Sequence, residues 1–140
     1  MTSALLEAEA TCRHLLARFI DHYDRGEADA CAELFTDDAE WTHAGTRVVG
    51  RAAVTAELHA RPADPPARHL VTSFFLDDAA EDDATGRAQL VLFHTRVDEA
   101  GRRHGEVKGV GEFRTTFRRT SDGWRLRTHE GRESFALTPS

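Results

Sequence analysis

The feature that most constrains this fold is a change in the spacing of apolar residues along the chain. In residues 5–23 apolar side chains recur at intervals of three and four, which indicates a long helix with one buried stripe. The segment 61–66 contains Pro62, Pro65 and Pro66, and proline has no amide hydrogen for a helix or a central strand. Beyond this segment the apolar spacing becomes two, as in β-strands. The sequence therefore predicts helices first and strands afterwards.

Turn residues divide both halves into elements. Ser3 is expected to cap the long helix and Gly26 to end it. Two shorter helices are expected at residues 28–35 and 51–60, with a brief strand at 40–44 between them. The second half is expected to form four strands, at residues 68–77, 86–98, 106–120 and 123–135. This order predicts an α+β fold, in which helices close a strongly curved, mostly antiparallel sheet into a cone around a small-molecule pocket.

The composition narrows the classes of function. A chain of 140 residues is the length of one domain, and we expect residues 1–140 to form a single one. Its 24 acidic and 18 basic residues give a net charge of -6, which argues against nucleic acid and anionic membranes as partners. Without a membrane-spanning run or a signal-peptide pattern, a cytoplasmic location is expected. Cys12 and Cys31 lie in apolar helical patterns and are expected to be buried thiols, with a disulfide as the alternative.

Histidine is the main source of chemistry in this chain. The sequence lacks the Gly-rich nucleotide motifs, the GxSxG elbow and HExxH, so we expect neither a cofactor nor a metal. Four of the eight histidines fall in predicted strands: His43, His69, His94 and His129. Strand spacing places His94 on the face of Leu90 and Leu92, whereas the facing of His129 stays open. A histidine among apolar neighbours needs a hydrogen-bond partner, so each is either a satisfied core residue or part of a site.

Asp24 offers such a partner. It follows Tyr23 at the end of the long helix, where the chain meets the sheet, and His69 shares a predicted strand face with Val71 and Phe75. A carboxylate bonded to an imidazole fixes the tautomer of the ring and makes it a better base. We therefore predict that Asp24 and His69 form a proton-handling pair in the pocket. The residues alone leave equally open that Asp24 is a solvated helix-end residue.

Several runs resemble one known family. The resemblance is carried by FIDHYDRGE at 19–27, LFTDDAEW at 34–41, Gly50-Arg51, RHLVT at 68–72 and DGWRL at 122–126. In this order they resemble SnoaL-like proteins of the NTF2-like superfamily over nearly the whole chain. The resemblance implies the α+β cone. The catalytic pattern is most similar to that of scytalone dehydratase, and dehydrochlorinase and bile-acid dehydratase relatives also use an Asp–His pair.

The resemblance also implies roles for single residues. Catalytic roles fall on Tyr23, Asp24, His69 and His94. His43 stands where the dehydratase pattern has a second tyrosine, while Gly111 and Phe113 replace its serine and asparagine. The expected substrate-binding residues are Trp41, His43, Leu90, Leu92, Phe113, Phe117 and His129. For the apolar members of this set, ordinary core packing is the alternative.

The resulting hypothesis is a cofactor-independent lyase (dehydratase) or an isomerase or cyclase that acts on a small cyclic or polyketide-like carbonyl compound. His69 would remove a proton next to the carbonyl, Tyr23 would stabilise the enolate oxygen, and His94 would deliver a proton. Three alternatives stay open: a non-catalytic binding module, an oligomeric accessory subunit, and a metal site built from Asp24, His43, His69 and His94. The resemblance also implies a homodimer or homotrimer formed through the sheet.

Overall fold

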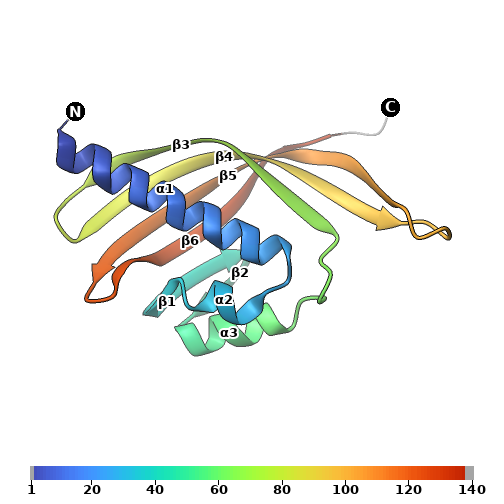
Figure 1. The fold of residues 1–140 in the computed structure, drawn as a ribbon, viewed down its shortest axis with the longest axis horizontal. Helices are drawn as coiled ribbons and strands as arrows, with labels where there is room; N and C mark the ends of the chain where they lie inside the picture. The colour runs from blue at the N-terminus through green and yellow to red at the C-terminus, as the bar shows by residue number, and fades with distance from the viewer. Residues whose placement is uncertain (1, 138–140) are drawn as a thin grey trace.

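The computed structural model describes residues 2–137, in which three helices cover a curved six-stranded sheet. The helices are α1 (Ser3–Asp24), α2 (Ala28–Ala32) and α3 (Arg51–His59). The strands are β1 (Phe35–His43), β2 (Thr46–Val49), β3 (Ala67–Ala79), β4 (Asp83–Val97), β5 (Arg103–Thr120) and β6 (Gly123–Ala136). Figure 1 shows α1 lying across one face of the sheet, with α2 and α3 next to β1 and β2. The predicted α+β class is confirmed.

The strand order in the sheet is β2-β1-β6-β5-β4-β3. The last four strands form the predicted antiparallel meander. β1 lies beside β6 and runs parallel to it, so the sheet is mostly rather than wholly antiparallel. This parallel pair places the first strand of the chain next to the last one. Residues from both halves of the sequence can therefore face one interior.

The long helix begins and ends for local reasons. Thr2, rather than Ser3, is the N-cap, because Thr2 has extended backbone angles and its Oγ1 accepts a hydrogen bond from the Leu5 amide at 3.2 Å. After the helix, Gly26 has a φ of +74°, a conformation that favours glycine. A Cβ at this position would lie 2.4 Å from the Ala63 carbonyl oxygen, so Gly26 also lets the proline segment pack closely.

Two elements differ from the prediction near the first strand. α2 ends at Ala32, and Phe35 is the first residue of β1 rather than the end of a helix. Phe35 is fully buried in the core, so tertiary packing decides its backbone conformation. Strand β2 was not predicted. It follows a tight turn in which Ala44 and Gly45 both have positive φ, and its residues are largely exposed, which weakens any alternating pattern.

A bulge in β3 changes which phenylalanine faces inward. His69 pairs with Leu92, but the register shifts between Val71 and Ser73. An inserted residue moves the following side chains to the opposite face. Phe74 is therefore buried, while Phe75 is 44% exposed. The prediction that Phe75 shares the inner face with His69 is wrong for this reason.

The core lies between α1 and the inner face of the sheet. Its central side chains include Leu16, Phe19, Phe35, Phe117 and Leu126, which are almost completely buried. Burial along β4 alternates with a period of two, so one face of the strand contacts the core. Within the described part of the chain, no helix has both the length and the hydropathy that crossing a bilayer requires.

Candidate active site

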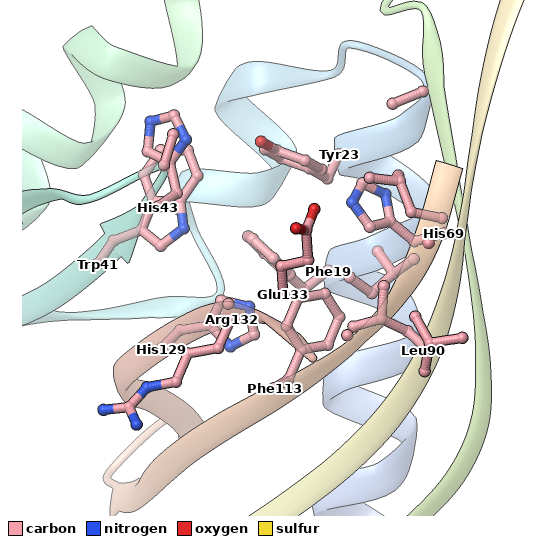
Figure 2. A pocket seen from close by; sticks show the side chains of 18 of the residues that line it. Phe19, Tyr23, Trp41, His43, His69, Leu90, Phe113, His129, Arg132 and Glu133 are labelled. Carbon is pink, nitrogen blue, oxygen red and sulfur yellow. The ribbon is translucent and has the colours of Figure 1, made fainter. Parts of the chain in front are cut away.

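A pocket with a volume of about 570 Å³ opens between the end of α1 and the inner face of the sheet. This volume is in the range of small-molecule sites. The predicted residues that line it are Tyr23, Trp41, His43, His69, Leu90, Leu92, His94, Phe113 and His129. Figure 2 shows His69 on one side of the pocket and Trp41 with His43 on the other. The site thus combines an apolar wall with a few convergent polar groups.

Asp24 and His69 are hydrogen-bonded. Asp24 Oδ1 lies 2.7 Å from His69 Nδ1, and Asp24 Oδ2 accepts the His69 backbone amide at 2.8 Å. The two side chains are only 10% and 14% exposed. Because Asp24 accepts the Nδ1 proton, the neutral ring keeps a lone pair on Nε2. The two-point contact holds His69 at the pocket wall with its free nitrogen available to a ligand.

Tyr23 is held against the same wall by a cation. The Arg61 guanidinium carbon lies 3.4 Å from the centre of the Tyr23 ring, and Arg61 Nη1 donates to the Tyr23 carbonyl oxygen at 2.8 Å. Burial raises the pKa of the Tyr23 hydroxyl above its ordinary value, and the Arg61 charge partly opposes this. The hydroxyl is therefore a proton-bearing hydrogen-bond donor at neutral pH.

The wall opposite His69 is an aromatic stack. The rings of Trp41 and His43 lie 4.2 Å apart and nearly parallel, at 13°. His43 Nε2 lies 3.3 Å from a carboxylate oxygen of Glu57 on α3, which orients the imidazole. Tyr23 meets Trp41 edge-on at 5.7 Å. His43 thus offers a flat, polar-edged surface where the dehydratase pattern has a tyrosine.

His129, whose facing was open, points inward. It is 2% exposed, and its Nδ1 lies 2.8 Å from the Thr115 hydroxyl oxygen. Burial, and then the nearby His69, lower the pKa of His129 from 6.5 to about 3. The ring is therefore neutral at neutral pH and acts through hydrogen bonds.

Two predicted residues differ in placement from the rest. Phe117 is not part of the pocket wall. It packs edge-on against Phe74 at 6.1 Å and is 1% exposed, because it lies four residues beyond Phe113 along β5, deeper in the core. His94 lines the pocket but is exposed near the open end, where it has no hydrogen-bond partner within residues 2–137. A side chain there can meet both a ligand and bulk water.

Sequence reasoning missed several lining residues. They are Phe19, Ile20, Ala44, Gly45, Arg61, Ala67, Gly109, Val110, Gly131, Arg132 and Glu133. Phe19 could have been found, since it lies one helical turn before Tyr23 on the buried stripe. Arg61 carried no signal, because it lies in the proline segment. Gly111 is required by a close approach: a Cβ there would lie 2.8 Å from the Arg132 carbonyl oxygen.

Two other chemistries lack the geometry they need. Within residues 2–137, one group of three potential metal ligands converges, and it is Asp21, His22 and Glu27 on the surface. Asp24 and the pocket histidines form no such group, so the metal alternative is not supported at the pocket. Cys12 and Cys31 are free, and burial raises the pKa of each thiol to about 12. Such thiols are poor nucleophiles.

Comparisons with known proteins find the same fold. An NTF2-like protein with a cystatin-like fold from Novosphingobium aromaticivorans is 28% identical, with a TM-score of 0.73, over 92% of this chain and 84% of its own. A candidate scytalone dehydratase from the same species is 18% identical, with a TM-score of 0.77, over 96% of this chain and 88% of its own. A hexachlorocyclohexane dehydrochlorinase from Novosphingobium barchaimii is 18% identical, with a TM-score of 0.74, over 94% of this chain and 90% of its own.

A search among curated proteins found no match. The model of the SnoaL-like domain, by contrast, matches residues 4–130, which is most of the chain and includes all but the first residue of α1, the whole of α2 and α3, and strands β1 to β5 complete. The structural neighbours share the NTF2-like, cystatin-like architecture described above. The family that the sequence runs suggested is thus the one that the fold supports: this chain belongs to the SnoaL-like domain family of NTF2-like proteins.

Proposed function

We propose that this protein is a cofactor-independent lyase or isomerase that acts on a small cyclic carbonyl compound by acid–base catalysis. The observation that carries the proposal is the Asp24–His69 hydrogen bond of 2.7 Å at the wall of an apolar pocket. It fixes the His69 ring and leaves Nε2 as a lone-pair acceptor at the pocket wall. A positioned general base needs both of these properties.

The proposed reaction begins at the carbon next to the carbonyl group. His69 Nε2 takes a proton from this carbon, and the electrons of the C–H bond form an enolate whose charge rests on oxygen. The Tyr23 hydroxyl donates a hydrogen bond to that oxygen. If the substrate has a β-hydroxyl group, the enolate electrons expel it while His94 supplies a proton, and water leaves. In an isomerase the proton returns to a different carbon.

Two structural neighbours lend support from their names alone. One is named as a candidate scytalone dehydratase and the other as a hexachlorocyclohexane dehydrochlorinase, and both names describe eliminations. At 18% identity each shares the fold with this chain. The acid–base proposal for this protein rests on its own Asp24–His69 pair.

Deuterium exchange tests the first step without knowledge of the substrate. The wild-type protein would be incubated in D₂O with a panel of cyclic ketones, β-hydroxyketones and β,γ-unsaturated ketones, and deuterium at the α-carbon measured by mass spectrometry. The expected result is catalysed exchange for at least one compound. The His69→Ala variant should lose it by about 10²–10⁴-fold, the usual contribution of a positioned base.

The chain contains a matched control for this substitution. His59 also pairs with an aspartate at 2.7 Å, but on the surface, so His59→Ala should retain wild-type exchange. Exchange by His69→Ala within about tenfold of wild type would remove His69 as the base. Saturable binding of a panel ketone without any exchange would instead identify a non-catalytic binding module.

A further inference from the structure

His129 is a buried polar group in the pocket that the proposed mechanism does not use. It lies on β6 opposite Trp41 of β1, is 2% exposed, and lines the pocket. A buried imidazole has two polar atoms to satisfy. Nδ1 is paired with Thr115, whereas Nε2 has no partner within residues 2–137. The free nitrogen belongs to a ring that forms part of the pocket wall.

The Thr115 hydroxyl determines which nitrogen carries the proton. Thr115 is 2% exposed, and its hydroxyl has His129 Nδ1 as its one hydrogen-bond partner among the described residues. A buried O–H needs an acceptor, so Thr115 donates to Nδ1. Neutral His129 then carries its proton on Nε2. The opposite arrangement would leave the buried hydroxyl hydrogen without an acceptor and is less favourable.

The surroundings of His129 keep it uncharged. Its ring lies 5.0 Å from that of Phe19 and 4.7 Å from that of Phe113. Thr115 on β5 and Trp41 on β1 add no charge, and the ionisable group that acts on it is His69 across the pocket. Burial and this neighbour both lower the pKa of His129, to about 3. The ring thus offers a fixed N–H dipole rather than a transferable proton.

Phe113 connects the two pocket histidines. Its ring centre lies 6.0 Å from that of His69 and 4.7 Å from that of His129. A flat ring placed along Phe113 therefore has the base at one end and the N–H donor at the other. Figure 2 shows this arrangement, with Phe113 below the pocket, His69 on one side and His129 on the other. The rest of the wall includes the aromatic rings of Phe19, Tyr23 and Trp41, whose faces suit a planar compound, beside aliphatic residues and the charged Arg61, Arg132 and Glu133.

We propose that His129 donates its Nε2 hydrogen to the carbonyl oxygen of a planar cyclic ketone that lies along Phe113. The inference rests on the proposed function, and it names the substrate class and a second donor besides Tyr23. As His69 takes the α-proton, negative charge moves to the ketone oxygen, and the bond from His129 strengthens without proton transfer. A neutral imidazole acts in this way as an electrophile.

The tautomer of His129 can be measured directly. Two-dimensional ¹H–¹⁵N NMR of the labelled full chain distinguishes a neutral ring with the proton on Nε2 from one with the proton on Nδ1. We expect His129 to be neutral and protonated on Nε2 between about pH 5 and pH 8. Addition of 2-tetralone, an uncharged bicyclic ketone, should shift the Nε2 hydrogen signal, whereas the hydrocarbon tetralin should not. Protonation on Nδ1, or the absence of a ketone-specific shift, would overturn the inference.

Thr115 provides a second test with a matched control. Thr115→Val removes the hydroxyl at nearly constant volume and should move a measurable fraction of His129 to the tautomer protonated on Nδ1. Thr116, the next residue, bonds Thr128 at 2.7 Å on the other face of the same strand. Thr116→Val should leave the His129 signals unchanged. Equal effects of the two substitutions would show that Thr115 does not select the tautomer.

Activity variants separate this inference from the proposed function. His129→Phe should lower ketone α-exchange by about 10²–10³-fold, the usual loss for one donor to a developing oxyanion, while His129→Gln should restore part of it. Full exchange by His129→Phe would remove the donor role and leave His69 as the base. No exchange by wild type, together with the ketone-specific NMR shift, would remove the reaction and leave His129 as a ketone-binding group.

Discussion

Two of the Asp–His pairs within residues 2–137 have the same separation and different surroundings. Asp24–His69 and Asp29–His59 both have a carboxylate oxygen 2.7 Å from a ring nitrogen. The side chains of the first pair are 10% and 14% exposed, and those of the second are 80% and 55% exposed. The first pair lies at a pocket wall, and the second joins α2 to α3 on the surface.

The same distance therefore does not give the two pairs the same chemical setting. Water competes for both partners of the surface pair, and exposed ion pairs contribute about 0–1 kcal/mol. The interior pair is shielded, and Asp24 also accepts the His69 backbone amide, so the ring has one orientation. The free nitrogen of His69 faces a ligand-sized volume, whereas His59 faces solvent. Burial and a second contact give the Asp24–His69 pair one fixed geometry, which the exposed pair lacks.

The largest expected difference between the pairs is in activity. Asp24→Asn presents an amide that can donate to His69 Nδ1, which forces the ring proton onto Nε2 and removes the lone pair that the base needs. Ketone α-exchange should fall by about 10²–10⁴-fold. Asp29→Asn should have no effect on the same assay. If both variants retain wild-type exchange, the interior pair does not act as a base.

The second largest difference between the pairs is expected in the free energy of unfolding. Asp24→Ala leaves the Nδ1 hydrogen and the backbone amide of His69 without their acceptor in a partly buried site, at about 1–3 kcal/mol for each unsatisfied group. Asp29→Ala loses an exposed pair and should cost about 1 kcal/mol or less. Urea unfolding followed by circular dichroism measures both. Similar losses for the two variants would contradict the environmental explanation.

The smallest expected difference concerns stability in acid. Here the buried His129 is compared with the surface residue His59. Burial lowers the pKa of His129 to about 3, from 6.5. Below pH 6.5 the unfolded chain binds a proton at this residue and the folded chain does not, so the free energy of unfolding falls as the pH drops toward 3. At pH 5 the loss should be about 2 kcal/mol.

Substitution isolates that contribution. His129→Phe should reduce the fall in unfolding free energy between pH 7 and pH 5, measured by urea unfolding, whereas His59→Gln should leave it close to that of wild type. The same pH dependence in wild type and His129→Phe would show that His129 is not held neutral by the fold. The surface control excludes a general effect of removing a histidine.

Most of the fold was accessible from periodicity and turn residues. The long helix, the third helix and the four-strand meander all follow patterns that depend on neighbours close in the chain. The predictions failed where distant contacts decide. Phe35 becomes a strand residue because it packs in the core, and Phe75 turns outward because of an irregularity in pairing with β4. Strand β2 was missed because its exposed residues give no alternation.

Less of the candidate site than of the fold could be predicted from the sequence. The position of Asp24 at a helix end and the strand location of His69 suggested their pairing, and family resemblance supported it. Arg61 stacks on Tyr23 from a proline segment with no recognisable pattern. Phe113 and Phe117 have the same strand parity, so sequence spacing could not show that one lines the pocket and the other lies in the core.

Local periodicity and turn residues were enough to predict the order of the elements and the inward faces of most strands, while residue chemistry and the family resemblance together pointed to Asp24 and His69 as a candidate pair. Three features follow only from the three-dimensional arrangement: His129 points inward onto Thr115, Asp24 contacts His69 at two points, and a pocket lies beside them. These features join residues far apart in the chain. They arise from sheet curvature and strand register, which a shift of one residue reverses.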